Sequence, residues 1–122
     1  MQSGSAVLGS IQPQPIGNAA DGSLPLELLD KAVKPADFHF ARTRLLALEN
    51  TWHGRVLAQD YVIAATDWAR SRGLATHLDG ARLFNAAVAS GAAPRELATP
   101  FDSVSMRAFA RILMTPRPVV YA

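Results

Sequence analysis

Two short apolar runs that each end in a carboxylate place the strongest constraint on how this chain can fold. Residues 45–50 read LLALEN and residues 74–79 read LATHLD. Short apolar runs are typical of buried parallel strands, and parallel strands need a long crossover connection between them. The segment between the runs has helical periodicity. We therefore expect buried parallel strands at 45–49 and 74–79, connected by a helix at 59–72.

The segment 59–72 has the clearest helical pattern of the chain. Tyr61, Ala64, Ala65 and Trp68 recur at helical spacing, and Gly73 is positioned to end the helix.

The other segments extend the same pattern. Short apolar segments predict strands, Gly91 and Pro25 mark helix ends, and prolines 13 and 15 keep their neighbours extended. The expected elements are a short strand and then an extended segment within 5–16, a helix at 24–33, a helix at 81–90, a helical turn within 94–100 and a third parallel strand at 101–105. This order predicts an α/β fold, a partial parallel or mixed sheet with flanking helices.

Composition excludes several classes of function. The 122 residues include no cysteine, which excludes disulfides, thiolate metal sites and cysteine nucleophiles. The net charge is +2, and the ten arginines are spread along the chain, so no nucleic-acid partner is expected. The three histidines lack metal-ligand spacing, and no apolar run approaches the roughly 18 residues that span a bilayer. The amino terminus lacks the features of a signal peptide, so the expected location is the cytoplasm, with no metal and no membrane partner.

The candidate site lies at the carboxyl ends of the first two strands, where open α/β sheets bind ligands. Glu49 and Asn50 end one strand, and Asp79 ends the next, with Arg82 three residues later. An ionised carboxylate in this place can keep a heteroaromatic ring nitrogen protonated, as in enzymes that use pyridoxal phosphate. Alternatively, Asp79 caps a helix that begins at Ala81, with Arg82 as a surface partner, and the residues alone favour this cap.

Two histidines lie near the same strand ends. His77 shares a strand face with Asp79 and is either a neighbour of the site or a satisfied core residue. His53 lies in the loop after the first strand, where it could stack or transfer a proton, or simply be exposed. The residues leave these alternatives open.

Five segments together resemble the low-specificity L-threonine aldolases: AVLGSIQPQPI, DGSLPL, HFARTRLLALENT, GRVL and HLDGARLFNAAVA. These enzymes depend on pyridoxal phosphate and have the aspartate-aminotransferase-like fold, type I. The resemblance implies homo-oligomers that cleave threonine or allo-threonine to glycine and an aldehyde, within amino-acid metabolism, threonine breakdown and glycine formation.

The resemblance also implies roles for individual residues. Asp79 would pair with the pyridine nitrogen of the cofactor, and Arg82 would contact its phenolic oxygen. Glu49 and Asn50 would border the pocket. The family has a histidine directly after the threonine of its LENT motif, but Trp52 stands there in this chain, so His53 is a possible pocket residue only.

The chain departs from the family after the third strand. Family members carry a Ser-Lys-Gly segment whose lysine binds the cofactor covalently, whereas residues 106–118 read MRAFARILMTPRP and contain no lysine. The family's phosphate-binding segment and substrate-carboxylate arginine have no counterpart either. Residues 1–122 are therefore expected to be a central, truncated part of the cofactor-binding large domain, without activity. The alternative is a non-catalytic remnant or an interaction module that docks on an intact paralogue, and whether the chain is an enzyme is left open.

Overall fold

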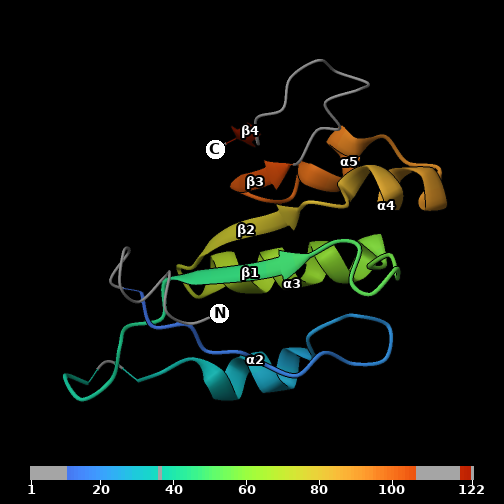
Figure 1. Ribbon diagram of the computed structural model, residues 1–122. Helices are drawn as coiled ribbons and strands as arrows, with labels where there is room; N and C mark the ends of the chain where they lie inside the picture. Colours follow the sequence, from blue (N-terminus) through green and yellow to red (C-terminus); the bar gives the residue numbers. More distant parts are fainter. Residues whose placement is uncertain (1–10, 36, 107–118, 122) are drawn as a thin grey trace. The chain divides into compact units, whose positions relative to one another are not determined.

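The computed structural model describes residues 11–35, 37–106 and 119–121 (Figure 1). The chain divides into two compact units. One comprises residues 1–19 and 24–43, and the other comprises residues 20–23 and 44–122.

The first unit contains the helix α2 (Leu26–Ala32). The helix begins directly after Pro25, as expected where a fixed φ suits the first turn. Leu29 is buried on this helix. Residues 11–16 form no regular element, in line with the expected extended segment, and the strand expected before them lies mostly outside the described residues.

The second unit is built on a four-stranded mixed sheet in the order β1, β2, β3, β4 (Figure 1). The strands β1 (Leu45–Glu49), β2 (Ala75–Gly80) and β3 (Ser103–Met106) run parallel. The short strand β4 (Val119–Tyr121) pairs antiparallel with β3. The prediction of an α/β fold with three parallel strands is confirmed, and β1 has the predicted bounds.

The helices of this unit are α3 (Gln59–Ser71), α4 (Leu83–Ser90) and α5 (Pro94–Ala98). Gly91 ends α4 with φ 73°, and its N–H donates to the carbonyl of Ala87. The predicted start of this helix at Ala81 is wrong by two residues. Arg82 is its N-cap residue, and no side chain caps the helix. The interpretation of Asp79 as a helix cap is therefore also wrong.

The helix predicted at 59–72 is confirmed as α3, and small side chains form most of its buried side. The buried residues are Val62, Ala65, Thr66 and Ala69, while Ala64 is exposed and Trp68 is only half-buried. Such small side chains let a helix backbone approach a sheet closely. The hydroxyl of Thr66 is satisfied within the helix, because it donates to the carbonyl of Val62 at 2.9 Å.

The two faces of the sheet differ in burial. Leu46, Leu48, Thr76 and Leu78 are buried, whereas every alternate residue of β1 is exposed. Figure 1 shows α3 behind β1 and β2, so one layer of helix covers one face. The strands expected to be buried are thus covered on the side of α3, and the alternate residues of β1 are exposed on the other side. We name the other side, with residues 45, 47 and 49 of β1 and their register partners 75, 77 and 79 of β2, the open sheet face.

Gly80 ends β2 on the covered face and has no room for a side chain. An added Cβ would lie 2.7 Å from the carbonyl oxygen of Ser105 and 3.3 Å from Cβ of Leu83. A clash with backbone oxygen cannot be relieved by a rotamer change. Glycine at this position lets the turn into α4 pass close to β3.

We predict that Gly80→Ala lowers the free energy of unfolding by about 1–3 kcal/mol, because the sheet must shift to admit a methyl group. Gly17→Ala is the matched control, since nothing lies within 4 Å of its added Cβ. Urea unfolding followed by circular dichroism measures both variants. Equal stabilities of the two variants would contradict the prediction.

Candidate functional site

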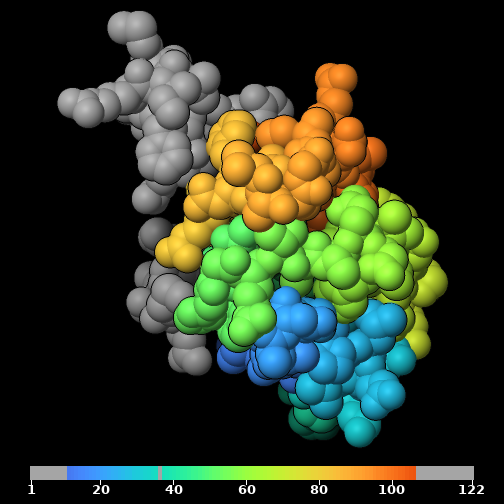
Figure 2. All heavy atoms as spheres, turned by 90° about the vertical axis from the view of Figure 1, so that its right-hand side faces the viewer, coloured from blue at the N-terminus to red at the C-terminus, as the bar shows by residue number. Residues whose placement is uncertain are grey.

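The carboxyl edge of the sheet brings two of the predicted site residues together. Glu49 and Asp79 are register partners on β1 and β2, and Ser105 of β3 is the next partner in the same row. Partners in a parallel ladder lie on the same face, so the two carboxylates are neighbours on the open sheet face. The arrowheads of β1 and β2 in Figure 1 point toward this edge, and Figure 2 shows the molecule from that side.

The carboxylate of Asp79 is exposed, and one of its two oxygens accepts a hydrogen bond. Its Oδ1 accepts the N–H of Ala81 at 3.1 Å, an Asx-type turn that fixes the side chain. Among the described residues, Oδ2 has no partner. Arg82 follows in the same turn and is exposed, and within the described part of the chain its guanidinium forms no ion pair with Asp79. One carboxylate oxygen is thus held and the other is free to accept a hydrogen bond.

Asn50 has a structural role at this edge. It is 2% exposed, and its N–H donates to the carbonyl oxygen of Asp79 at 3.2 Å. Its Oδ1 accepts the N–H of Leu57 at 3.3 Å. These two contacts tie the end of β1 to the end of β2 and to the start of the segment that leads into α3. Asn50 thus fixes the backbone that carries Asp79.

His53 lies at the tip of a tight two-residue turn. Trp52 and Arg55 exchange backbone hydrogen bonds of 3.0 and 2.8 Å, and both His53 (φ 46°) and Gly54 (φ 76°) have positive φ, as in a type I′ turn. The His53 ring is exposed and contacts the edge of Trp52. Because no contact of His53 with Asp79 is formed, its role as a pocket residue stays a prediction.

His77 is neither a core residue nor a contact of Asp79. It is half-buried on the open sheet face, and its Nδ1 is hydrogen-bonded to Oγ of Ser103, its register partner, at 2.8 Å. The contact joins β2 to β3 one step behind the carboxyl edge. This hydrogen bond gives His77 a structural role, because it links two neighbouring strands.

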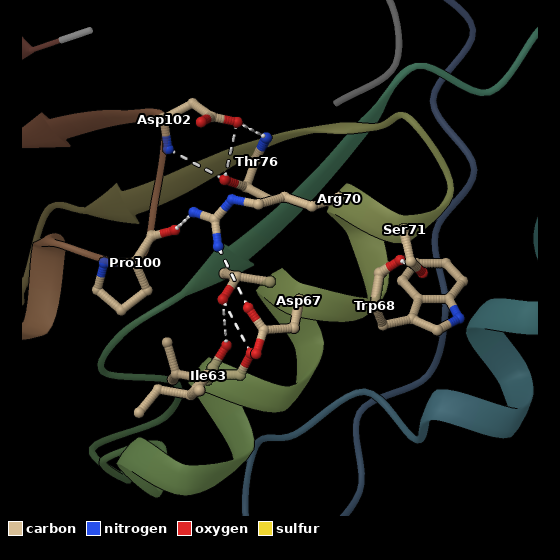
Figure 3. A network of polar contacts seen from close by, with 10 residues as sticks. Ile63, Asp67, Trp68, Arg70, Ser71, Thr76, Pro100 and Asp102 are labelled. Atoms are coloured by element: carbon tan, nitrogen blue, oxygen red, sulfur yellow. Dashed lines mark hydrogen bonds and ion pairs between the residues drawn. The ribbon is translucent and has the colours of Figure 1, made fainter.

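A polar network at the opposite, amino edge was not predicted from the sequence (Figure 3). Oδ2 of Asp102 accepts both the N–H and the hydroxyl of Thr76, at 2.8 and 3.1 Å. The N–H of Asp102 in turn donates to Oγ1 of Thr76 at 3.0 Å. Arg70 of α3 donates to the carbonyl of Pro100, and Asp67 pairs with Arg70 at 3.4 Å. The network ties the starts of β2 and β3 together and has a structural role.

The pocket predicted for Asp79 and Arg82, shared with Glu49 or Asn50, stays a prediction. Two apolar hollows lie elsewhere: one of about 530 Å³ is lined by α4, α5 and the turn between them, and one of about 450 Å³ lies between α5 and β3. Within the described ranges, no group of three side chains suits a metal ion, and no helix is both long and apolar enough to cross a bilayer.

Comparison with known proteins identifies the family. The family model of the beta-eliminating lyases matches residues 2–113, most of the chain. The chain belongs to the beta-eliminating lyase family. Members of this family and the threonine aldolases depend on pyridoxal phosphate. The resemblance to low-specificity L-threonine aldolases is confirmed by individual relatives.

Relatives with this name occur in bacteria and plants. The chain is 55% identical over 103 residues to the low specificity L-threonine aldolase of Escherichia coli O157:H7. The matched region covers 84% of this chain and 31% of the relative. The chain is also 36% identical over 108 residues to a probable low-specificity L-threonine aldolase 2 of Arabidopsis thaliana, covering 84% of this chain and 30% of the relative. The chain thus spans about a third of the length of these relatives.

A solved structure confirms the fold. A Listeria monocytogenes protein assigned as an L-allo-threonine aldolase superposes with a TM-score of 0.71 at 22% identity. The match covers 98% of this chain and 32% of the other. The chain therefore has the fold of one part of that protein.

We predict that Asp102→Ala destabilises the chain by about 1–3 kcal/mol, because the buried Thr76 loses the acceptor of its N–H and its hydroxyl. Asp67→Ala is the control, since it removes only an exposed ion pair and costs about 0.5 kcal/mol or less. Denaturant titration compares the two variants. A loss for Asp67→Ala as large as that for Asp102→Ala would refute the network's role.

Proposed function

We propose that the turn from Asp79 to Arg82 binds the pyridine ring of pyridoxal phosphate, as part of a lyase that cleaves β-hydroxy-α-amino acids such as threonine to glycine and an aldehyde. The observation that carries this proposal is the Asp79 carboxylate, held by Ala81 on one oxygen and free on the other. A protonated ring nitrogen is a donor suited to that free oxygen, and a charge-assisted hydrogen bond of this kind is strong.

The residues present fit the ring but not its covalent attachment. Bound pyridoxal phosphate would supply an electron sink for the pair of electrons left on the amino-acid α-carbon after cleavage. Asp79 would hold the proton on the ring nitrogen that makes the ring electron-poor. Arg82, exposed in the same turn, would donate to the phenolic oxygen. Asn50 would keep Asp79 in place through its contact with the Asp79 backbone.

Covalent attachment requires a lysine, and the chain has only Lys31 on α2 and Lys34 after it. No lysine follows β3 in the sequence, where the resemblance implies one. We therefore propose that the 122-residue polypeptide is inactive as an aldolase. Its homo-oligomeric state and its location in the cytoplasm stay predictions from the sequence.

The ring-binding role is tested with pyridoxine 5′-phosphate, which has the same ring but cannot react with a lysine. Titrated into isotope-labelled chain, it is expected to shift the amide signals of residues 79–82 by nuclear magnetic resonance. Asp79→Asn weakens this binding about tenfold, because a charged acceptor is lost. Asp67→Asn, on the exposed side of α3, leaves it unchanged. Signals that move elsewhere, or an Asp79→Asn variant that binds equally well, would overturn the assignment.

The missing covalent step is tested directly. Chain incubated with pyridoxal phosphate and reduced with sodium borohydride is expected to carry no stoichiometric adduct in peptide mapping. Incubated with threonine, it is expected to release no glycine. The E. coli relative, treated identically, serves as the positive control. A single modified lysine together with glycine release would refute the proposed inactivity.

A further inference from the structure

A short turn that is distant from the sheet in sequence belongs to the same compact unit as the sheet. Residues 20–23 group with residues 44–122, whereas the chain on either side of them belongs to the other unit. Gly22 in this turn has φ 89°, a conformation that favours glycine. The surroundings of Gly22 show what the turn packs against.

Trp52 lies directly against Gly22. A Cβ added to Gly22 would lie 3.2 Å from Cβ and 3.3 Å from Cε3 of Trp52, and 3.5 Å from Cδ2 of Leu57. The first two distances are shorter than ordinary van der Waals contact, so even a methyl group there would require Trp52 to move. Leu57, beside the same glycine, is buried. The backbone of the turn thus forms one wall of the place that Trp52 occupies.

The turn that receives Trp52 is held in shape by its own side chains. Oδ1 of Asp21 accepts the N–H of Ser23 at 2.9 Å and its hydroxyl at 2.6 Å. These hydrogen bonds hold the pKa of Asp21 below its usual value, and the positive charge of Arg55 acts in the same direction. Arg55 also exchanges backbone hydrogen bonds with Trp52. Packing and charge therefore join the turn to the same part of the chain.

Trp52 is connected to Asp79 through the segment that contains it, residues 50–57, which we call the edge loop. The edge loop is closed at its base, where Oδ1 of Asn50 accepts the N–H of the buried Leu57 at 3.3 Å. The N–H of Asn50 donates to the carbonyl oxygen of Asp79 at 3.2 Å. A displacement of Trp52 is therefore passed to both ends of the edge loop, and at one end to the backbone of Asp79.

We propose that Trp52 is a positioning residue for Asp79. Packed on Gly22, Trp52 fixes the edge loop, and the edge loop fixes the end of β1 that is hydrogen-bonded to Asp79. The inference rests on the proposed function only for its effect on ring binding. Its effect on the backbone is measured in the free chain, so the two proposals can fail separately.

The first test needs no ligand and follows hydrogen exchange of individual amides by nuclear magnetic resonance. Trp52→Ala is expected to speed exchange at Asn50 and Leu57 about tenfold relative to exchange at Leu78, because local opening of the edge loop frees both amides. Trp68→Ala is the matched control, since it removes another half-buried indole, from α3. We expect it to leave the exchange at Asn50 and Leu57, relative to Leu78, unchanged.

A second pair of variants moves Trp52 without removing it. Gly22→Ala is expected to speed the same two amides, because the added methyl group displaces the indole. Gly73→Ala is its control, since Gly73 also has positive φ (71°) but nothing lies within 4 Å of its added Cβ. Circular dichroism checks that every variant is folded, and if Trp52→Ala is not, the glycine pair decides. Unchanged exchange at Asn50 and Leu57 in the folded variants would overturn the inference.

The last measurement is the affinity for pyridoxine 5′-phosphate. Trp52→Ala is expected to weaken binding about fivefold, because Asp79 is no longer held ready for the ring. Trp52→Phe, which keeps a ring on Gly22, and Trp68→Ala are expected to bind as the unmodified chain does. Unchanged affinity in Trp52→Ala, where Asp79→Asn still weakens binding, would overturn the positioning role. If the unmodified chain does not bind the ring, the proposed function fails, and the exchange measurement alone decides whether Trp52 holds Asp79.

Discussion

The pairing of β1 with β2 in one register is the interaction on which the rest of this structure depends. It places Glu49 beside Asp79 and is fastened at that end by the N–H of Asn50 on the carbonyl of Asp79. A shift by one residue would move Asp79 to the covered face and Leu78 into solvent, because side chains alternate across a strand. The burial of Leu48 and Leu78 and the exposure of the two carboxylates are thus two consequences of one register.

Much of this arrangement could be predicted from the sequence because the apolar runs and the helix between them have clear periods. The strand predicted at 45–49 has the same bounds as β1, and the helix predicted at 59–72 agrees with α3 to within one residue. The start of α4 was harder to predict, because Asp79 and Ala81 suggest a cap while the backbone first makes an Asx turn. The helical period alone did not show which side of α3 is buried, where Ala65 and Ala69 are covered while Trp68 is only half-buried.

The sequence indicates some residues of the candidate site, whereas the contacts between them are known only from the structure. The strand-end rule and the family motif place Asp79 and Arg82 at the carboxyl edge, and the structure brings Glu49 beside Asp79. The sequence could not indicate that Asn50 is a backbone clamp or that His77 is used in a cross-strand hydrogen bond, because both depend on register. Nor did it indicate Asp102, whose partner Thr76 lies 26 residues away and meets it only when β2 pairs with β3.

The carboxylates at the two edges of the sheet differ in how many of their hydrogen-bond acceptors are occupied. At the amino edge, the carboxylate of Asp102 accepts hydrogen bonds from the N–H and the hydroxyl of Thr76. A carboxylate satisfied in this way adds rigidity but has little capacity left to bind a ligand. At the carboxyl edge, Asp79 keeps one oxygen free, and Glu49 adds a second charge with no cation among the described residues. Asp79 thus keeps hydrogen-bonding capacity that Asp102 has already used, and a protonated ring nitrogen bound as proposed would use that capacity as the donor to its free oxygen.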